Sequence, residues 1–583
     1  MIRFESMESE TGPFEFVIPI SYGSTEVFET GRWSFQKPES VLGWAPCEEA
    51  CPAGNPVPES IHLIEEGQFR EALETILLEN PFPGTCGRVC YHPCEQECHR
   101  KKFDEPVSIN DLERFTFDVT LDHDPEFSSF PWRDARRIAI VGAGPCGLSC
   151  AYFLSLLGHR VTLFEAEEEP GGILRWGIPQ YRLPKDVLRK EVERILSLGV
   201  EMKTGTEVGK SFRFEDLKGF DALFVSPGAR GSRSLGVKGE ESKRVWKGIE
   251  FLRKINSGKR IKVGEKVIVI GGGNTAIDVA RSARRLGCSV LVAYRRTEEE
   301  MPSLPEEVLE AKEEGVRFEF LIQPVEIKET RRGKMRVKFQ RLQRVSVIGE
   351  RRFLSIPVEG GDVTFEADWV FTAIGEEVDL SWLPESLIEN KFIKPEAHLW
   401  DNRMVLAGGD AIHQPRRVVD AISSGKRAAI LMDIHFRGFK KEEVLSRIKK
   451  GDKGGLSMAS YLRGLKSGQW EEPKKVVPYE DLNPLFFKPK ERLKNEILPP
   501  EERLKGFLEV HRGFTSEEAR ISASRCFSCG HCNFCFNCYS FCPEGVVFFD
   551  PDGTRRVDLN HCKGCGTCSK VCPRHVIEMR VVL

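Results

Sequence analysis

The period of the hydrophobic positions changes along the chain. Between 58 and 80, apolar residues recur at helical spacing in PESIHLIEEGQFREALETILLEN, which predicts helices. From 137 the pattern becomes apolar strand, glycine loop and helix, once in RRIAIVGAGPCGLSCAYFLSLLGHRVTLFE and again in EKVIVIGGGNTAIDVARSARRLGCSVLVAYRR. Each stretch is a βαβ unit, so the pattern predicts parallel, doubly wound sheets. The runs VRFEFLI, RVKFQRL and VTFEADWVFTAIG alternate as strands do, and we expect them to complete the second unit.

These changes divide the chain into segments. At 583 residues the chain has the length of about four domains. The expected segments are an N-terminal arm (1–40), a helical, cysteine-rich domain (41–132), the first part of a dinucleotide-binding domain (133–240), a second dinucleotide-binding domain (241–370), the second part of the first one (371–440), an extended connector with short helices, rich in Lys, Glu and Pro (441–520), and a compact cysteine-rich module (521–583).

The charge balance argues against two kinds of partner. Lys and Arg number 85 against 88 Asp and Glu, and this net charge of −3 gives no basic surface for nucleic acid. No run of 18 apolar residues is present to span a bilayer, and the start MIRFESMESE carries Glu where a secretory signal carries Lys or Arg. We therefore expect a cytoplasmic protein with no membrane insertion.

The 19 cysteines are concentrated in two parts of the chain. Six lie from Cys47 to Cys98, and ten lie from Cys526 to Cys572. Because the cytosol keeps thiols reduced, such groups are more often metal ligands than disulfides. The sequence therefore predicts a metal-dependent function rather than a plain hydrolase.

The C-terminal cysteines follow the spacing CxxCxxCxxxCP twice. This is the arrangement of bacterial two-cluster ferredoxins, in which three cysteines of one run bind one [4Fe–4S] cluster and the fourth completes the other. The expected sets are Cys532, Cys535, Cys538 and Cys572 for one cluster, and Cys562, Cys565, Cys568 and Cys542 for the second. Zinc is the alternative for paired CxxC motifs, but two complete runs with a trailing Pro argue against it.

The first glycine loop has the context that a dinucleotide site requires. Gly142, Gly144 and Gly147 follow an apolar strand and open a helix, so the loop can turn tightly, approach a pyrophosphate and pack closely on the strand. Glu165 ends the next strand, about 20 residues further on, where a carboxylate accepts hydrogen bonds from a ribose diol. A tight turn beside a surface Glu is the alternative.

The second loop repeats this geometry without the acid. The expected contacts of this loop are Gly271, Gly273, Asn274 and Thr275. The position that corresponds to the acid of the first unit is Tyr294, which Arg295 and Arg296 follow. A guanidinium group binds a 2′-phosphate that a carboxylate would repel, so the pair favours NADP(H) over NAD(H). The alternative is an exposed basic strand end, with NAD(H) sharing the site.

Three motifs give the chain a resemblance to a known family. PGGILRWGIPQYRLPK (170–185), the YRRTEEEMPS stretch and the AGGD stretch resemble the small subunit of NADPH-dependent glutamate synthase. The same motifs are similar to the flavin arm of dihydropyrimidine dehydrogenase and to the large subunit of bifurcating NADH-dependent ferredoxin:NADP oxidoreductase. The resemblance covers most of 45–435. It implies an α/β flavoprotein with nested Rossmann-like FAD and NAD(P)H domains, between an N-terminal helical iron–sulfur domain and a C-terminal ferredoxin-like α+β domain.

The resemblance also implies where the cofactors bind. The first unit would hold FAD and the second NAD(P)H, with Gly172 and Arg182 near the flavin. Flavoproteins of this class hold the ribityl chain with an Asp at the end of an apolar strand. Here Gly409 and Asp410 in MVLAGGDAI match that position.

The N-terminal cysteines follow the family pattern in part. The related enzymes carry CxxCxxxxCxxxCP and then GRVC, and they hold two [4Fe–4S] clusters there. This chain keeps APCEEACP and CGRVC but lacks the leading CxxC, so one or two clusters are expected. By the family pattern, the cluster nearer the flavin would use Cys51, Cys90, Cys94 and a downstream residue that is not Cys, for which Glu113 is the candidate. An exposed helical Glu is the alternative for Glu113.

The missing cysteine pair has a candidate at the other end of the chain. SEEARISASRCFSCG resembles the phrase that precedes the leading CxxC in the related enzymes, and it contributes Cys526 and Cys529. We therefore hypothesise a cluster shared between the two ends, held by Cys47, Cys98, Cys526 and Cys529. The alternative is that Cys526 and Cys529 are free thiols or bind a metal locally.

The predicted activity is electron transfer between NAD(P)H and iron–sulfur clusters through FAD, with no catalytic side chain named. A chain that ends in clusters and shows no organic-substrate domain is predicted to be a subunit. Expected partners are ferredoxin or a hydrogenase, formate dehydrogenase, aryl-CoA reductase or glutamate synthase large subunit. The alternatives are the glutamate synthase small subunit itself, against which the appended module counts, and a non-catalytic cluster-carrying scaffold. The direction of electron flow and bifurcation at the flavin stay open.

Overall fold

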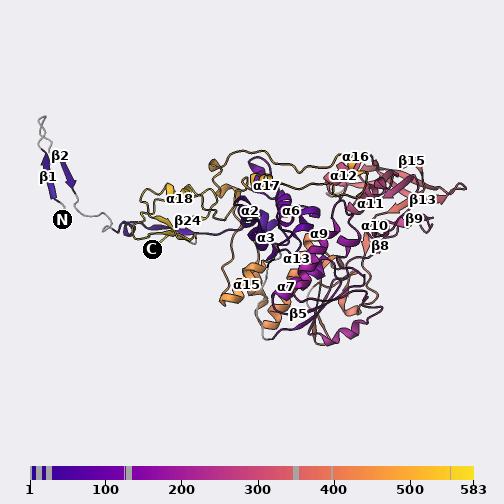
Figure 1. Ribbon diagram of the computed structural model, residues 1–583, viewed down its shortest axis with the longest axis horizontal. Coiled ribbons are helices and arrows are strands. Elements are labelled where there is room, and N and C mark those ends of the chain that lie inside the picture. The colour runs from indigo at the N-terminus through magenta and orange to yellow at the C-terminus, as the bar shows by residue number, and fades with distance from the viewer. Residues whose placement is uncertain are drawn as a thin grey trace.

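Figure 1 shows an elongated molecule with the C-terminal module at one end, the helical N-terminal domain beside it and the two dinucleotide-binding domains beyond. The computed structural model describes residues 3–7, 16–20, 29–123, 125, 134–345, 353–395, 398–551 and 553–582. Among these residues, no helix combines the length and the apolar character that crossing a bilayer requires.

The N-terminal domain is a small helical bundle. Its helices are α1 (Pro46–Ala50), α2 (Val57–Glu65), α3 (Phe69–Leu77), α4 (Pro83–Val89), α5 (Pro93–Gln96) and α6 (Ile109–Val119). The predicted helical period is present, since Ile61 and Ile64 of α2 are buried against Phe115 of α6. Ala519 and Ala523 of α17 (Ser516–Ala523) lie in the same core, so a C-terminal helix completes this domain.

The first dinucleotide-binding domain is built on a six-stranded sheet, parallel except at the edge strand β20. The strand order is β20 (His398–Trp400), β21 (Arg403–Ala407), β7 (Ala222–Val225), β4 (Arg137–Val141), β5 (Arg160–Phe164) and β6 (Glu201–Lys203). Its main helices are α7 (Pro145–Leu156), α8 (Ile173–Trp176), α9 (Lys185–Ser197) and α13 (Val418–Arg437). The predicted doubly wound fold is confirmed, and β21 returns to the sheet after the second domain.

The second dinucleotide-binding domain has a five-stranded parallel sheet. Its order is β12 (Arg317–Phe320), β11 (Ser289–Tyr294), β10 (Lys266–Ile270), β16 (Trp369–Thr372) and β9 (Val245–Lys247). An antiparallel sheet of β13 (Ile322–Glu329), β14 (Met335–Val345) and β15 (Leu354–Ala367) packs beside it. The helices are α10 (Gly248–Asn256), α11 (Asn274–Arg285) and α12 (Pro305–Glu313). Two short pairs, β8 (Gly231–Ser232) with β17 (Glu376–Glu377) and β18 (Ile388–Glu389) with β19 (Phe392–Ile393), lie outside these sheets.

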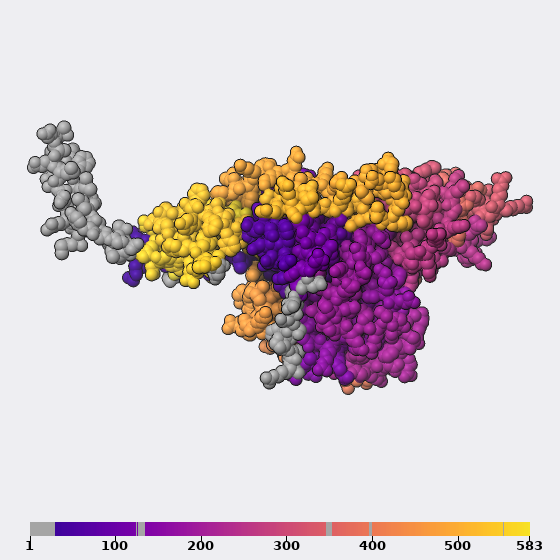
Figure 2. All heavy atoms as spheres, in the orientation of Figure 1, coloured from indigo at the N-terminus to yellow at the C-terminus, as the bar shows by residue number. Residues whose placement is uncertain are grey.

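The structure differs from the expected connector at 441–520. α14 (Lys441–Ile448) and α15 (Met458–Ser467) belong to the core of the first dinucleotide-binding domain, because Ile448, Met458 and Tyr461 are fully buried there. The extended course starts after these helices. It runs along one face of the molecule to α16 (Pro500–Arg503), where Arg503 pairs with Glu313 at 2.8 Å (Figure 2). Short helices are expected in this segment, but its high Lys and Glu content gives no sign that two of them pack into a domain core.

The expected arm at 1–40 also differs in part. β3 (Gln36–Ser40) pairs antiparallel with β24 (Ile577–Val581), so the N-terminal segment supplies a strand to the C-terminal module. The rest of the module contains α18 (Asn537–Ser540), α19 (Thr567–Lys570), β22 (Val547–Phe549) and β23 (Arg555–Val557). Farther out, β1 (Arg3–Met7) and β2 (Phe16–Ile20) form a hairpin (Figure 1). The sequence QKPES has no apolar alternation that would have predicted β3.

Candidate functional site: two nucleotide loops and four cysteine sets

The first glycine loop joins β4 to α7 in a tight turn. A Cβ on Gly142 would lie 2.3 Å from the carbonyl oxygen of Ser226, and one on Gly147 would lie 1.9 Å from that of Gly142. Gly142 has a φ of +98°, a region that favours glycine. Around Gly144, which precedes α7, no described atom lies within 4 Å of an added Cβ. The loop therefore leaves open space at the helix N-terminus, where a pyrophosphate binds.

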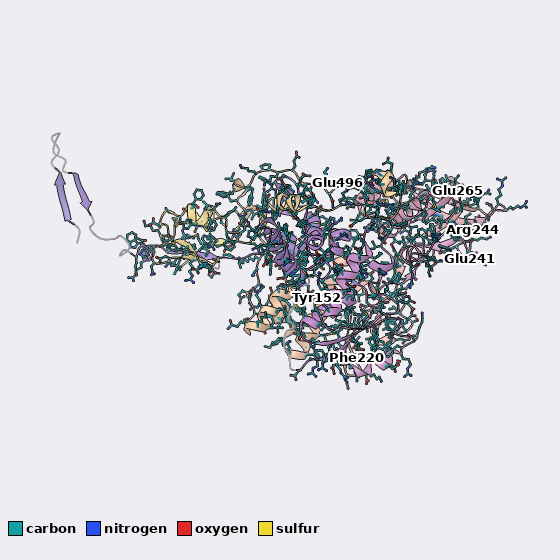
Figure 3. All side chains as sticks on the ribbon, in the orientation of Figure 1. Tyr152, Phe220, Glu241, Arg244, Glu265 and Glu496 are labelled. Atoms are coloured by element: carbon teal, nitrogen blue, oxygen red, sulfur yellow. The ribbon has the colours of Figure 1, made fainter. Side chains whose placement is uncertain are left out.

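Glu165 and Gly172 both lie against this loop. Glu165 is buried at the end of β5, and its Oε2 accepts a hydrogen bond from the Ala143 N–H at 2.7 Å. Its Oε1 accepts another from the N–H of Glu167 at 2.9 Å. A Cβ on Gly172 would lie 3.0 Å from the Cα of Gly144, so only a residue without a side chain allows this approach. Both predicted contacts thus stand beside the pyrophosphate loop. Figure 3 shows the dense side-chain packing of this domain around Tyr152 of α7.

Asp410 lies at the same site, although it comes from the second part of this domain in the sequence. It follows β21 in the turn Gly409–Ala411, and a Cβ on Gly409 would lie 3.0 Å from the Cβ of Cys146 on α7. Burial raises the pKa of Asp410 to about 6, and Arg416 opposes that rise. Within the described part of the chain, its carboxylate accepts no hydrogen bond. A buried carboxylate without a donor is costly, and the hydroxyls of a ribityl chain would satisfy it, so the site fits FAD.

The second glycine loop joins β10 to α11. A Cβ on Gly271 would lie 2.1 Å from the carbonyl oxygen of Ala373, whereas one on Gly273 would meet its nearest described atom, in Pro302, only at 4.0 Å. As in the first loop, atoms crowd the first glycine of the turn, and space is left beside the N-terminus of the helix. Thr275 in the first turn of α11 donates a hydrogen bond to Glu376 at 3.4 Å. The loop therefore fits a second pyrophosphate.

Arg295 and Arg296 follow β11 at the carboxyl end of the sheet, next to this loop. Arg295 is exposed and Arg296 is half-buried. In the part of the chain that the structure describes, neither guanidinium group forms an ion pair. Tyr294 before them is buried and donates its hydroxyl to the Glu300 carbonyl at 3.0 Å, so it closes the position where an acid would bind a ribose. Two positive charges without an acidic partner at this edge fit a 2′-phosphate.

Arg182, which the resemblance places near the flavin, is paired with acids of the second dinucleotide-binding domain. It is buried, with Nη1 3.0 Å from both carboxylate oxygens of Asp278 on α11 and Nε 2.6 Å from Glu307 on α12. Its charge is therefore neutralised by the second dinucleotide-binding domain, and the residue ties the two domains together. The motif at 170–185 contains this arginine, but it gives no information on which acidic residues pair with it.

Three cysteines gather where the helical domain meets the two glycine loops. Cys51 follows α1, Cys90 follows α4, and Cys94 lies in α5. Burial raises the pKa of the Cys90 thiol, and Glu113 and Cys51 nearby raise it further. Burial likewise raises the pKa of Cys94, again with Cys51 as a close neighbour. Iron would relieve this crowding, because metal ligation stabilises thiolates.

Glu113 faces these thiols from α6. It is not exposed, and burial raises its pKa to about 8. Oε1 accepts hydrogen bonds from the side-chain amides of Asn55 at 2.9 Å and Asn80 at 2.8 Å. Oε2 has no hydrogen-bond donor among the described residues. An oriented, buried carboxylate with one free oxygen beside three thiols is suited to be the fourth ligand.

The four cysteines of the hypothesised shared site lie together. Burial raises the pKa of Cys47, and the nearby Cys98, Cys526 and Cys529 raise it further. The same proximity raises the pKa of Cys529 through Cys526 and Cys98. Cys47 and Cys529 are buried in one apolar cluster with Ala519 of α17. The structure thus brings cysteines from both ends of the chain to one place.

Backbone and side-chain contacts hold the two cysteine-rich segments of the chain together at the shared site. The Gly43 N–H donates to the Gly530 carbonyl at 3.2 Å, and a Cβ on Gly530 would lie 2.7 Å from the Gly43 carbonyl oxygen. His531 Nε2 lies 2.8 Å from Glu48 Oε2. Glu48 is itself buried and pairs with Lys450 at 2.9 Å. The C-terminal module is therefore docked directly on the cysteine helix α1.

The C-terminal module brings its eight cysteines close together. Cys542, Cys562, Cys565 and Cys568, which are predicted to form one set, line one pocket. Burial raises the pKa of Cys538, and its neighbours Cys532 and Cys535 raise it further. Cys572 lies in one apolar cluster with cysteines of both predicted sets, so its place in a set stays a prediction. Cys535 and Cys565 are exposed, so each set has one ligand at the surface.

All 19 cysteines are free thiols in this structure. Within the described ranges, no three His, Cys, Asp or Glu side chains converge as they would around a single ion. Iron–sulfur cubanes hold their cysteines around a larger core than one ion does.

Three stretches of the chain match known families. Residues 136–425 match the family described as pyridine nucleotide-disulphide oxidoreductase, 43–124 match dihydropyrimidine dehydrogenase domain II with its 4Fe–4S cluster, and 531–576 match the 4Fe–4S dicluster domain. The small chain of NADPH glutamate synthase from Escherichia coli is 34% identical over 412 residues, which are 66% of this chain and 87% of that one. The chain belongs to the glutamate synthase small chain family.

Two further relatives match a longer part of the chain. The beta subunit of NADPH-Fe(3+) oxidoreductase from Geobacter sulfurreducens is 36% identical over 528 residues, covering 83% of this chain and 75% of that one. The beta subunit of NADP(+)-dependent formate dehydrogenase from Moorella thermoacetica is 34% identical over 521 residues, covering 83% and 70%. The predicted family is confirmed.

Membership of the glutamate synthase small chain family confirms three further predictions. The chain is an oxidoreductase subunit, it binds FAD and NAD(P)H, and it carries 4Fe–4S domains at both ends. The relatives to which it is similar are named as subunits or chains of larger enzymes.

The sequence does not indicate that two further residues are buried beside Cys51 and Cys90. Cys86 is buried next to Glu113 and Cys90, although no pattern distinguishes it from a packing residue. Lys426 on α13 is fully buried near Cys51, and its Nζ donates to Glu79 Oε2 at 2.5 Å. A lysine within a helix that also carries exposed basic residues gives no indication of burial.

Proposed function

We propose that this chain is the pyridine nucleotide subunit of a larger redox complex, and that electrons pass between NAD(P)H and the C-terminal module along the four cysteine sets. The succession of these sets along the chain carries the proposal. Cys51 and Cys94 of the flavin-side set are each four residues from a member of the shared set, namely Cys47 and Cys98. Cys529 of the shared set is three residues from Cys532. Each set is therefore tied by short peptide to the next.

The residues of the two loops supply placement and charge. FAD, when bound, supplies the chemistry that links two-electron hydride transfer to one-electron transfer. The first loop with Glu165 and Asp410 would hold its pyrophosphate, ribose and ribityl chain. The second loop would hold NAD(P)H, and the Arg182–Asp278 pair fixes the relative position of the two domains. Burial of the N-terminal donors keeps water from the path between them.

The terminal acceptor is proposed to bind at the C-terminal module. Cys535 is exposed and is flanked by the half-exposed rings of Phe534 and Phe536. Tyr539 and Phe541 add further exposed aromatic surface. Aromatic residues are enriched at protein interfaces, so this surface favours a bound subunit of the hydrogenase, formate dehydrogenase, aryl-CoA reductase or glutamate synthase type over a freely diffusing ferredoxin.

A second candidate function is that of the glutamate synthase small chain itself, which the nucleotide loops would serve equally. That relative matches 66% of this chain, so a third of the chain has no counterpart in the alignment. The C-terminal module would then have no role in the transfer, which makes this the weaker proposal.

Anaerobic addition of NADPH to the FAD-replete protein tests the first step. We expect the flavin absorbance to bleach and the iron–sulfur absorbance of the C-terminal module to bleach after it. An unchanged spectrum would leave only the alternative of a non-catalytic scaffold that carries clusters. Bleaching of the flavin without the module would favour the glutamate synthase function.

The double variant Arg295→Ser, Arg296→Ser tests the NADP(H) preference. Loss of even one charge-assisted hydrogen bond to the 2′-phosphate, worth about 1.5–3 kcal/mol, should raise the Kd for NADPH about 10- to 150-fold and leave NADH binding nearly unchanged. Arg317→Ser is the matched control, because Arg317 is an exposed arginine at the start of the neighbouring strand β12. Equal losses for both nucleotides would contradict the assignment. Equilibrium titration of flavin-free protein measures both constants.

A further inference from the structure

A hydrogen bond joins the flavin-side cysteine loop to the second nucleotide loop. Asn274 Nδ2 donates to the hydroxyl oxygen of Tyr91 at 2.7 Å. Tyr91 lies between Cys90 and Cys94, and Asn274 is the first residue of α11. Two segments far apart in the sequence, one carrying proposed cluster ligands and the other the proposed pyrophosphate site, are thus in direct contact.

The direction of this hydrogen bond is fixed by a second one. Asn274 Oδ1 accepts from the N–H of Leu304 at 3.0 Å, so its Nδ2 must face Tyr91. Nδ2 is also a donor at a helix N-terminus, where an anion is favoured. A nucleotide phosphate at this loop would compete with Tyr91 for that donor. A hydrogen bond to a charged oxygen is stronger than one to a neutral hydroxyl, so the phosphate would win.

The surroundings of Tyr91 come from all three domains. Arg182, paired with Asp278 one turn further along α11, and Arg417 before α13 are its charged neighbours. The ring is half-buried, and burial raises the pKa of the hydroxyl, so it stays protonated at neutral pH. In the described ranges, the Tyr91 hydroxyl finds no acceptor for its own proton. The hydrogen bond that the structure gives to this hydroxyl is therefore the one from Asn274.

We propose that Tyr91 is a positioning residue that couples nucleotide binding to the flavin-side cluster. With the nucleotide loop free, the Asn274–Tyr91 hydrogen bond holds the Cys90–Cys94 loop. A bound pyrophosphate takes the Asn274 donor, and the loop changes its position around the cluster. Such coupling is reciprocal, so the state of the cluster also changes nucleotide affinity. The inference rests on the proposed function, because it needs a nucleotide at the second loop and a cluster at Cys90 and Cys94.

Tyr91→Phe tests the coupling with ADP-ribose 2′-phosphate, which carries the pyrophosphate and 2′-phosphate but no reducible ring. In the wild-type holoprotein reduced with dithionite, we expect this probe to change the electron paramagnetic resonance g values of the flavin-side cluster. In Tyr91→Phe the g values should no longer respond. The probe should also bind about fivefold more tightly, because no hydroxyl competes for Asn274.

Tyr479→Phe is the matched control. Tyr479 is half-buried, and its ring contacts that of His99 edge to face, with 5.7 Å between the ring centroids. His99 follows Cys98 of the shared set. The control therefore removes a tyrosine hydroxyl beside a different cysteine loop. It should respond to the probe as wild type does. If the probe binds but the wild-type g values do not change, or Tyr91→Phe responds like wild type, the coupling is wrong and the proposed function stands. If the probe does not bind the wild-type protein at all, both fail.

Discussion

Replacing Cys529 by Ser is expected to remove four iron atoms from each chain. Cys529 is one of four cysteines that the structure gathers from both chain ends, and it is buried among Cys47, Cys98 and Cys526. A [4Fe–4S] cluster left with three cysteines loses the ligand that closes it. Since this set stands between the flavin side and the C-terminal module, NADPH should still bleach the flavin. It should reduce the module more slowly by about 100-fold or more, since loss of a ligand exceeds the 10- to 100-fold effect of its supporting residues. Iron and acid-labile sulfide analysis and rapid-freeze spectroscopy measure the two effects.

Cys288→Ser is the control for this experiment. Cys288 is also buried, but it lies in the second dinucleotide-binding domain, where its thiol donates to the Gly264 carbonyl at 3.3 Å. The Cys288→Ser variant should contain as much iron as the wild type and should transfer electrons at the same rate. If Cys529→Ser keeps all its iron, the shared cluster does not exist, and Cys526 and Cys529 are the free thiols of the alternative interpretation.

Glu113→Ala should likewise cost four iron atoms, but from the flavin-side set. The carboxylate is positioned by Asn55 and Asn80 and leaves one oxygen free beside Cys51, Cys90 and Cys94. Without it the set has three thiols and a small cavity. We expect NADPH to reduce the flavin as before, while reduction of every cluster beyond it falls by about 100-fold or more, since loss of a ligand exceeds the 10- to 100-fold effect of its supporting residues.

Cys86→Ser distinguishes the two donors that the structure places at this site. Cys86 lies next to Glu113 and Cys90 and is equally buried, so it is the competing fourth ligand. We expect the serine variant to keep its iron. The reverse pattern, iron lost with Cys86→Ser and kept with Glu113→Ala, would show that the thiol and not the carboxylate binds the cluster.

The parts of the site that lie within one local motif could be predicted from the sequence. The spacing of Gly142, Gly144 and Gly147 defines a turn whose geometry needs glycine wherever it occurs, and the structure shows the expected collisions at two of the three positions. The cysteine runs of the C-terminal module are equally local. In both cases a short stretch of chain fixes the positions of all the groups that act together.

Features that depend on distant packing could not be predicted in this way. Arg182 belonged to a recognised motif, but its partners Asp278 and Glu307 come from another domain. Tyr91 met Asn274 only through the relative placement of three domains. The shared cysteine set was proposed because of a resemblance. Its spacing alone, with most of the chain lying between Cys98 and Cys526, contains no information on proximity.

The pairing of β3 with β24 has a consequence for how the protein is made. Ser40 pairs with Ile577, which is synthesised long after it, and α17 completes the core of a helical domain that contains α1 to α6. Domains usually fold in order as they leave the ribosome. Here the helical domain lacks a helix and two cysteines until residues 516–529 have been translated. Insertion of the proposed shared cluster must therefore wait for these residues, and a chain truncated before them would lack that cluster, although the flavin-side set would be complete.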